Sequence, residues 1–309
     1  MQVERLPGGA WPVMVTPFRE DRSIDWTALD ALVEWYLAAG VAGLFAVAQT
    51  SEMYALSAEE RRTLADRVVR RVAGRVPVVA CGSFGRDLGE QAASVREMAA
   101  TGVAAVVAVT SQVAAPGESD AILEDRLLAL ADAAGEVALG LYECPLPYKR
   151  LLSPELVAVL AKTGAFSFYK ETSERPSFVG AKATAAENSP LSIYNAEMSS
   201  LLESLRLGAH GFSGNAGNYY PELVQWLCGA GVAGDARAES VQLALSVADA
   251  VVSSPLYPAS AKYFLARQRN VPILPICRVS NVGLSEHDLR LLEHLHRHMQ
   301  TIDLPVRLV

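Results

Sequence analysis

The chain has 309 residues and a mass of 33.0 kDa, of which 51% are hydrophobic and 20% charged. This composition can fill a large core, which excludes a disordered chain. The net charge of −7 and the lack of a basic block argue against a nucleic-acid partner. No apolar run reaches the roughly 18–20 residues that a membrane span requires, so we expect no membrane association.

The N-terminus and the cysteines indicate the compartment. The opening segment, MQVERLPGGAWPV, lacks the basic and apolar regions of a secretory signal. The four cysteines, Cys81, Cys144, Cys228 and Cys277, are far apart and form no CxxC pair. A disulfide framework or a structural zinc site is therefore not expected. We predict a soluble, cytoplasmic protein without a bound metal.

Short apolar runs recur along the chain roughly 20–35 residues apart. Near-continuous apolarity is typical of strands buried on both faces, as in parallel sheets. In chain order the expected strands are Gly9–Val15, Gly43–Ala48, Val76–Cys81, Val103–Val109, Val137–Tyr142, Ala165–Lys170, Leu191–Tyr194 and Gly211–Gly214.

Amphipathic segments fill the gaps between these runs, and several have clear start signals. Asp25 is a candidate helix cap, and Ser57-Ala58-Glu59-Glu60 has the form of a capping box. Ser153-Pro154 places a cap before a proline at the first helical position, and Arg175-Pro176 resembles it. The other expected linkers are Asp87–Ala100, Ser119–Ala134, Ser199–Leu207 and Tyr220–Ala230. Three further helical segments follow at Ala236–Val252, Ala259–Ala266 and Ser285–Gln300.

Eightfold alternation of strand and helix predicts an α/β fold, a (β/α)8 TIM barrel. A doubly wound open sheet is the competing architecture, but no strand is followed by a GxGxxG or GxxxxGK[ST] loop. We expect residues 1–231 to form the barrel with the active site. Residues 232–309 are expected to be a C-terminal helical extension packed on it within a single structural domain.

Active groups of a barrel gather where its strands end, and Lys170 is the most informative residue there. The chain has five lysines, and only Lys170 ends an apolar strand. Partial desolvation would lower the pKa of this amine and suit it to Schiff-base formation. A strand-end lysine paired with a glutamate or reaching solvent is the alternative.

Two other strand ends carry candidate groups. Tyr142 closes the neighbouring strand, where its phenol could move protons during imine formation or be an ordinary buried tyrosine. Thr50 and Ser51 precede a predicted helical turn, where hydroxyl and backbone N–H groups suit a carboxylate or simply cap the turn.

Together these residues resemble the dihydrodipicolinate synthase/N-acetylneuraminate lyase family of class I, Schiff-base aldolases. The resemblance runs over nearly the whole chain. It rests on five motifs in the family's order: Val15-Thr16-Pro17-Phe18, Gln49-Thr50-Ser51-Glu52-Met53-Tyr54-Ala55-Leu56, Tyr142-Glu143-Cys144-Pro145, Tyr169-Lys170-Glu171-Thr172-Ser173 and Gly211-Phe212-Ser213-Gly214.

The resemblance implies a function and a set of roles. Lys170 would attack the ketone of pyruvate or another 2-oxo acid, Tyr142 would relay protons, and Thr50 and Ser51 would hold the carboxylate. An aldehyde would be the second substrate, made or released as a C–C bond forms or breaks. No metal or organic cofactor is implied, and a homo-oligomer, a tetramer or a dimer, is expected.

Several positions depart from the family pattern. Gln49 stands where the family has a hydroxyl residue of the proton relay, and Glu143 stands in place of Asn. The synthase's tyrosine after strand 4 is absent from residues 108–113, and its arginine falls near Pro147, with Lys149 and Arg150 slightly later. Aspartate semialdehyde is therefore not the expected aldehyde.

Four residues besides Thr50 and Ser51 are candidate substrate contacts. Gln49 and Glu143 are expected near the barrel mouth, with an ion pair from Glu143 to Lys149 or Arg150 as the alternative. Gly214 and Asn215 lie at the end of strand 8, where Asn215 could contact the distal end of the substrate or serve the turn.

Three other functions stay open at this point. A sugar-acid dehydratase would use the same Schiff base to expel hydroxide. A non-catalytic barrel would only bind a 2-oxo acid, although such a binder needs neither Lys170 nor Tyr142. A metal-dependent barrel lyase is the remaining alternative.

Overall fold

The structure is a computed structural model that describes residues 3–253, 256–281 and 283–308. Eight parallel strands lie side by side in the order β1-β8-β7-β6-β5-β4-β3-β2. An isolated parallel bridge from Val13 to Phe45 closes the sheet into a barrel. The strands are β1 (Gly9–Ala10), β2 (Leu44–Val47), β3 (Val78–Cys81), β4 (Ala105–Val109), β5 (Ala138–Tyr142), β6 (Phe166–Glu171), β7 (Ser192–Asn195) and β8 (Gly211–Phe212).

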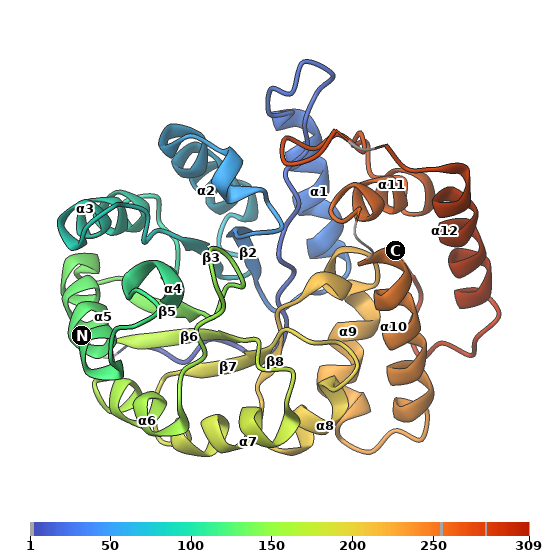
Figure 1. The fold of residues 1–309 in the computed structure, drawn as a ribbon. Coiled ribbons are helices and arrows are strands. Elements are labelled where there is room, and N and C mark those ends of the chain that lie inside the picture. The colour runs from blue at the N-terminus through green and yellow to red at the C-terminus, as the bar shows by residue number, and fades with distance from the viewer. Residues whose placement is uncertain (1–2, 254–255, 282, 309) are drawn as a thin grey trace.

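Helices surround the strands and continue beyond them (Figure 1). Those of the barrel are α1 (Trp26–Ala38), α2 (Ala58–Val72), α3 (Leu88–Ala99), α4 (Thr110–Val113), α5 (Asp120–Ala134), α6 (Pro154–Lys162), α7 (Pro176–Ala185), α8 (Leu201–Arg206) and α9 (Pro221–Trp226). Short turns are η1 (Met53–Ala55), η2 (Asn215–Asn218) and the π-helical η3 (Leu227–Gly231). The last helices are α10 (Ala238–Val252), α11 (Ala259–Gln268) and α12 (Glu286–Met299).

The predicted barrel and its C-terminal helices are confirmed, and the predicted caps explain where several helices begin. The Asp25 carboxylate accepts from two backbone N–H groups at the start of α1. Ser57 and Glu60 form the reciprocal capping box of α2. Pro154 opens α6 after the Ser153 cap. The turn η1 is the helical turn predicted after Thr50 and Ser51. The short elements α4 and η2 have no counterpart in the prediction because a single turn is too short to show a period.

Large aromatic side chains fill the barrel interior. Phe168 stacks on Tyr194 with ring centroids 4.8 Å apart and lies 5.3–5.4 Å from Trp11 and Phe45. Phe45 in turn meets the ring of Tyr142 edge-on at 5.9 Å. Because side chains alternate along a strand, Phe168 projects into the barrel on the same side as the residue two positions later in β6. This buried aromatic layer forms a floor beneath the ends of β5 and β6.

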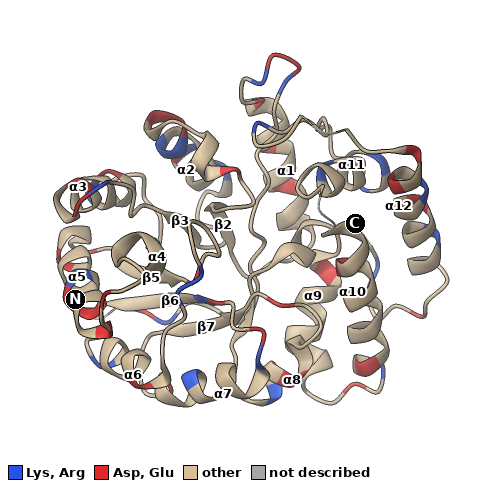
Figure 2. Ribbon diagram, in the orientation of Figure 1, with Lys and Arg blue, Asp and Glu red and all other residues tan. Residues whose placement is uncertain are grey.

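The helices after the barrel share its hydrophobic core. α10 contacts α8 and α9, and α12 contacts α10 and α11. Buried residues of α10 and α11 such as Leu245 and Phe264 belong to the same apolar cluster as the strands. Lys and Arg are interspersed with Asp and Glu over the outer helices (Figure 2). No helix in the part of the chain described here combines the length and apolarity needed to cross a bilayer.

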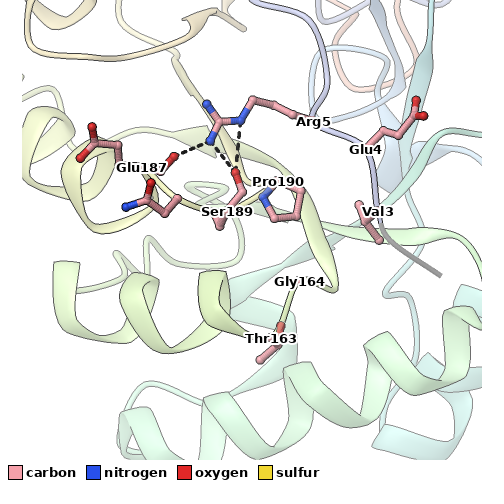
Figure 3. A pocket seen from close by; sticks show the side chains of 9 residues that line it. Val3, Glu4, Arg5, Thr163, Gly164, Glu187, Ser189 and Pro190 are labelled. Carbon is pink, nitrogen blue, oxygen red and sulfur yellow. Dashed lines mark hydrogen bonds between the residues drawn. The ribbon is translucent and has the colours of Figure 1, made fainter.

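The N-terminal segment crosses the opposite, amino-terminal end of the strands. The Arg5 guanidinium donates to the carbonyl oxygens of Glu187 and Ser189, as Figure 3 shows. Next to it lies a surface depression of about 830 Å³ that includes Thr163 and Gly164. Residues at this end of a barrel serve stability. These bonds tie the segment before β1 to the loop before β7.

Candidate active site

A cavity of about 480 Å³ opens at the carboxyl ends of the strands. Strand ends, the loops after β5 and β6, and the segment around α11 all contribute to it. Its lining combines apolar surface with hydroxyl, amide, phenol and carboxylate groups around two lysines. The lining residues are Gln49, Thr50, Glu52, Tyr54, Tyr142, Pro145, Leu146, Lys149, Lys170, Thr172, Glu174, Ala196, Gly214, Asn215, Tyr257, Pro258 and Val279.

Lys170 lies deep in this cavity. It is near the end of β6, directly beside Tyr142 of β5 in the sheet register. The side chain is only 5% exposed. Burial disfavours the ammonium and lowers the pKa of Lys170 from 10.5 to about 8. At pH 7 about a tenth of the amine is therefore neutral, against less than a thousandth for an ordinary lysine.

Tyr142 stands next to the amine. The Lys170 Nζ atom is 4.8 Å from the centroid of the Tyr142 ring. Burial, followed by the nearby thiols of Cys144 and Cys81, raises the pKa of the Tyr142 phenol. A phenol that keeps its proton at neutral pH can act as an acid toward a departing hydroxyl. Lys170 and Tyr142 thus converge on one cavity, as the sequence predicted.

Two hydroxyl groups lie together on another wall. Thr50 and Tyr257 both line the cavity, and their side chains share a hydrogen bond. Asn218 holds the tyrosine in place, since its Nδ2 atom donates to the Tyr257 hydroxyl at 2.6 Å. Such a pair of hydroxyls can donate to a carboxylate. Tyr257 has no signal in the sequence, because tertiary packing brings the segment before α11 to the barrel mouth.

Gln49, Gly214 and Asn215 also line the cavity. Gly214 is required by close packing: a Cβ atom there would lie 2.2 Å from the Ala196 carbonyl oxygen. Glu52 holds the loop, because its carboxylate accepts from Lys262 Nζ at 2.7 Å and from backbone N–H groups of residues 278 and 279.

Ser51 lies behind the cavity wall, which corrects its expected role as a direct contact. The side chain is fully buried, and its hydroxyl exchanges hydrogen bonds with the backbone N–H and carbonyl of Ala48, each 2.7 Å long. The backbone N–H of Ser51 also donates to Ala48. These bonds close the turn after β2 and leave Thr50 facing the cavity.

Glu143 points away from the cavity, which corrects its expected place in the barrel mouth. Residues 142 and 143 face opposite sides of the chain, so Tyr142 points inward and Glu143 toward the helices. The expected ion pair with Lys149 or Arg150 is also wrong. Glu143 pairs with Lys182 at 2.8 Å, whereas Lys149 pairs with Glu174.

Lys182 of α7 lies between two buried carboxylates. Its Nζ atom is 2.8 Å from both Glu143 and Glu171, and all three side chains are fully buried. The Tyr169 hydroxyl and two backbone N–H groups also donate to Glu143. Burial raises the pKa of the Glu143 carboxyl. Because Glu143 follows Tyr142 and Glu171 follows Lys170, this cluster joins the ends of the two strands that carry the reactive side chains.

The rim of the cavity carries a more exposed ion pair. Lys149 and Glu174 are 2.9 Å apart, with side chains 35% and 65% exposed. Arg150 binds the Asp120 carboxylate at 3.0 Å and the backbone of the loop before α5. Among the described residues, no group of three or more His, Cys, Asp or Glu side chains is arranged to hold a metal ion.

Comparison with known proteins places the chain in a family. The profile described as the Dihydrodipicolinate synthetase family matches residues 6–290. The chain belongs to this family. It is 30% identical over 293 residues to a 4-hydroxy-tetrahydrodipicolinate synthase of Acidithiobacillus ferrooxidans, covering 94% of this chain and 98% of the relative. A synthase of the same name from Laribacter hongkongensis is 27% identical, over 90% of this chain and 95% of that one.

Solved structures of the same family share the fold. The chloride-inhibited dihydrodipicolinate synthase from Acinetobacter baumannii, complexed with pyruvate, has a TM-score of 0.84 at 22% identity and covers 96% of this chain and 99% of its own. A prophage protein of the family from E. coli K12, also in complex with pyruvate, has a TM-score of 0.83 at 22% identity, with the same coverage. Membership in the dihydrodipicolinate synthetase family makes this protein a lyase.

Proposed function

We propose that the protein is a class I aldolase or lyase that uses pyruvate or another 2-oxo acid. Lys170 forms the Schiff base, and the resulting enamine makes or breaks a C–C bond with an aldehyde. The observation that carries this proposal is the buried amine of Lys170 beside the Tyr142 phenol, inside the cavity at the carboxyl ends of the strands. The pyruvate in two solved structures of the family supports the same class of substrate.

The chemistry follows from the positions of the groups. The neutral Lys170 amine attacks the ketone carbon and gives a carbinolamine. Tyr142 supplies a proton to the departing hydroxyl, and water leaves as the iminium forms. Thr50 and Tyr257 donate hydrogen bonds to the carboxylate. The iminium withdraws electrons from the adjacent carbon, which then loses a proton and becomes the nucleophilic enamine.

Aspartate semialdehyde is not the aldehyde we propose. A substrate with a distal carboxylate needs a cation at the cavity rim. The two cations in the loop after β5 are already engaged, Lys149 with Glu174 and Arg150 with Asp120. The side chains deeper in the cavity are mostly neutral donors and acceptors, including Gln49, Thr172 and Asn215. These groups suit an uncharged, hydroxyl-bearing aldehyde.

The test is a two-stage screen on the intact protein. A panel of 2-oxo acids with borohydride identifies the acid that gives the largest covalent adduct, and a panel of aldehydes with that acid is then examined for products by NMR. A new C–C bond supports an aldolase. Loss of water from a sugar acid would instead show a dehydratase, and an adduct without turnover would favour a binding protein. Loss of activity on addition of a chelator would indicate a metal-dependent lyase and contradict a mechanism that relies on the Schiff base alone.

We also propose that the protein assembles as a homotetramer or a homodimer and works in the cytoplasm. The family resemblance supports the oligomer. Light scattering of the purified protein measures the oligomeric state, and a monomeric mass at working concentration would contradict the proposed oligomer.

A further inference from the structure

The groups around Cys144 form a connected chain from the reactive centre to the solvent. Cys144 follows Tyr142 by two residues, and its thiol lies beside Gln49 and Tyr54, which line the cavity with Tyr142. The thiol is fully buried and hydrogen-bonds with the Tyr142 side chain. On its other side the Cys144 sulfur lies 4.0 Å from the Tyr54 hydroxyl. Tyr54 is 42% exposed and lines the cavity mouth.

Gln49 cannot pass a proton onward, as a hydroxyl residue at position 49 could. An amide offers a donor on nitrogen and an acceptor on oxygen, so it cannot pass a proton through one atom. A thiol and a phenol each donate and accept through the same atom. The Cys144 thiol donates to Gln49 Oε1 at 3.4 Å, so the amide orients the thiol.

We propose that Tyr142, Cys144 and Tyr54 form a proton relay that connects the Schiff-base centre with solvent within a single chain. This inference rests on the proposed function. The geometry assigns Cys144 as the central group of the relay, Tyr54 as its solvent-facing end and Gln49 as a positioning residue for the thiol.

The proton count balances at the dehydration step. Tyr142 gives its proton to the carbinolamine oxygen, the C–O bond breaks, water leaves and the C=N bond forms. The Cys144 proton then moves to the Tyr142 phenolate, the Tyr54 proton moves to the thiolate, and a solvent proton restores Tyr54. One solvent proton is consumed for each iminium formed from the neutral amine.

Before the reaction, two proton donors of the relay point to acceptors outside it. The Tyr54 hydroxyl donates to the Leu146 carbonyl at 3.0 Å, and the thiol donates to Gln49. Rotation of the Tyr54 O–H and Cys144 S–H bonds is sufficient to align the chain. The position of Tyr54 is fixed by the ring of Phe84, 6.4 Å away, and by Arg61, which donates to the carbonyl of Met53 beside it.

A nucleophilic role for the thiol lacks a base. None of the five histidines lines the cavity that the described residues form.

Deuterium exchange into the methyl group of pyruvate, followed by NMR in D₂O, tests the relay without an aldehyde. Deuterium enters pyruvate only through the iminium and its enamine, and the iminium can form repeatedly only if the relay restores the Tyr142 proton, so the exchange rate reports on the relay. We expect Cys144→Ala to slow exchange by roughly 10², while Cys144→Ser, which restores a group that both donates and accepts, stays within a few-fold of the parent protein. Tyr54→Phe should slow exchange as Cys144→Ala does.

Two comparisons separate a relay from altered packing. The double variant Cys144→Ala/Tyr54→Phe should be no slower than Cys144→Ala alone, because members of one relay act as a unit. Cys81→Ala, which removes another buried thiol near Lys170, should keep the parent rate. Equal slowing by Cys144→Ala and Cys144→Ser, additive effects of the two relay changes, or slow exchange in Cys81→Ala would overturn the relay.

Trapping and exchange in the parent protein distinguish failure of the relay from failure of the proposed function. If no 2-oxo acid is trapped on the parent protein, the proposed function fails. If pyruvate is trapped and exchanged equally fast in the parent protein and in both Cys144→Ala and Tyr54→Phe, only the relay fails. Tyr54→Phe removes one oxygen atom from a partly exposed residue, so it keeps the test valid even if changes at Cys144 reduce folding.

Discussion

Replacing Lys170 with methionine should make the fold more stable while it removes the reactive amine. The amine is held in a dry site above the aromatic floor, and this burial lowers its pKa from 10.5 to about 8. One pKa unit is worth about 1.4 kcal/mol, so folding at neutral pH carries a penalty of about 3 kcal/mol. Methionine has a similar length, and its sulfur packs well against the Tyr142 ring.

The stability gained by Lys170→Met should decrease as the pH rises. The folded pKa lies below the unfolded one, so between pH 8 and 10.5 the unfolded chain binds more protons and stability rises with pH. The penalty is fully present below pH 8 and falls to about 1.4 kcal/mol at pH 9.5. We therefore expect Lys170→Met to gain about 3 kcal/mol at pH 7 and about half of that at pH 9.5.

Urea unfolding of the parent protein and Lys170→Met at both pH values measures this difference. The difference between pH 7 and pH 9.5 isolates the titration from any packing effect of the methionine. Lys162→Met is the matched control, because Lys162 is an exposed lysine at the end of α6, and it should bring no gain at pH 7. A pH-independent effect, or a loss of stability at pH 7, would refute the claim that the amine is desolvated.

Three further changes and one control substitution test other parts of the site. Tyr142→Phe should slow turnover by roughly 10²–10⁴ through loss of proton transfer, and near-normal turnover would contradict that role. Thr50→Val should raise the KM for the 2-oxo acid roughly tenfold, with kcat little changed, because a hydrogen bond to a charged group is worth about 1.5–3 kcal/mol. Lys182→Met leaves two buried carboxylates without a cation and should cost about 3–5 kcal/mol in urea unfolding. Lys149→Met, which removes the exposed ion pair at the rim, should cost under about 1 kcal/mol. Equal losses of stability in Lys182→Met and Lys149→Met would refute the expected difference between buried and exposed pairs.

The barrel could be predicted because its elements are encoded locally. Each strand is a short apolar run, and residues such as Asp25, Ser57 and Ser153 mark helix starts by their side-chain chemistry. Strand ends are therefore known in advance, and a parallel barrel brings them to one face. This reasoning placed Lys170 and Tyr142 together, and the structure confirms their proximity.

The rest of the site depends on side-chain direction and on distant packing. Glu143 was expected in the barrel mouth because of its neighbour Tyr142, yet alternation along the chain turns it toward Lys182 of α7. Tyr257 enters the cavity from beyond the barrel and has no local pattern that would indicate it. Tyr54 lay inside a recognised motif, and its spacing from Gln49 carried no information about the loop that brings it to Cys144.

We expect one buried amine, that of Lys170, to bond covalently to the ketone of the substrate. Incubation with pyruvate and borohydride, followed by peptide mapping by mass spectrometry, locates the adduct directly. We predict one reduced pyruvyl group per chain, on the peptide that contains Lys170, and no such group in Lys170→Met. An adduct on another lysine, or equal labelling of the variant, would contradict the account.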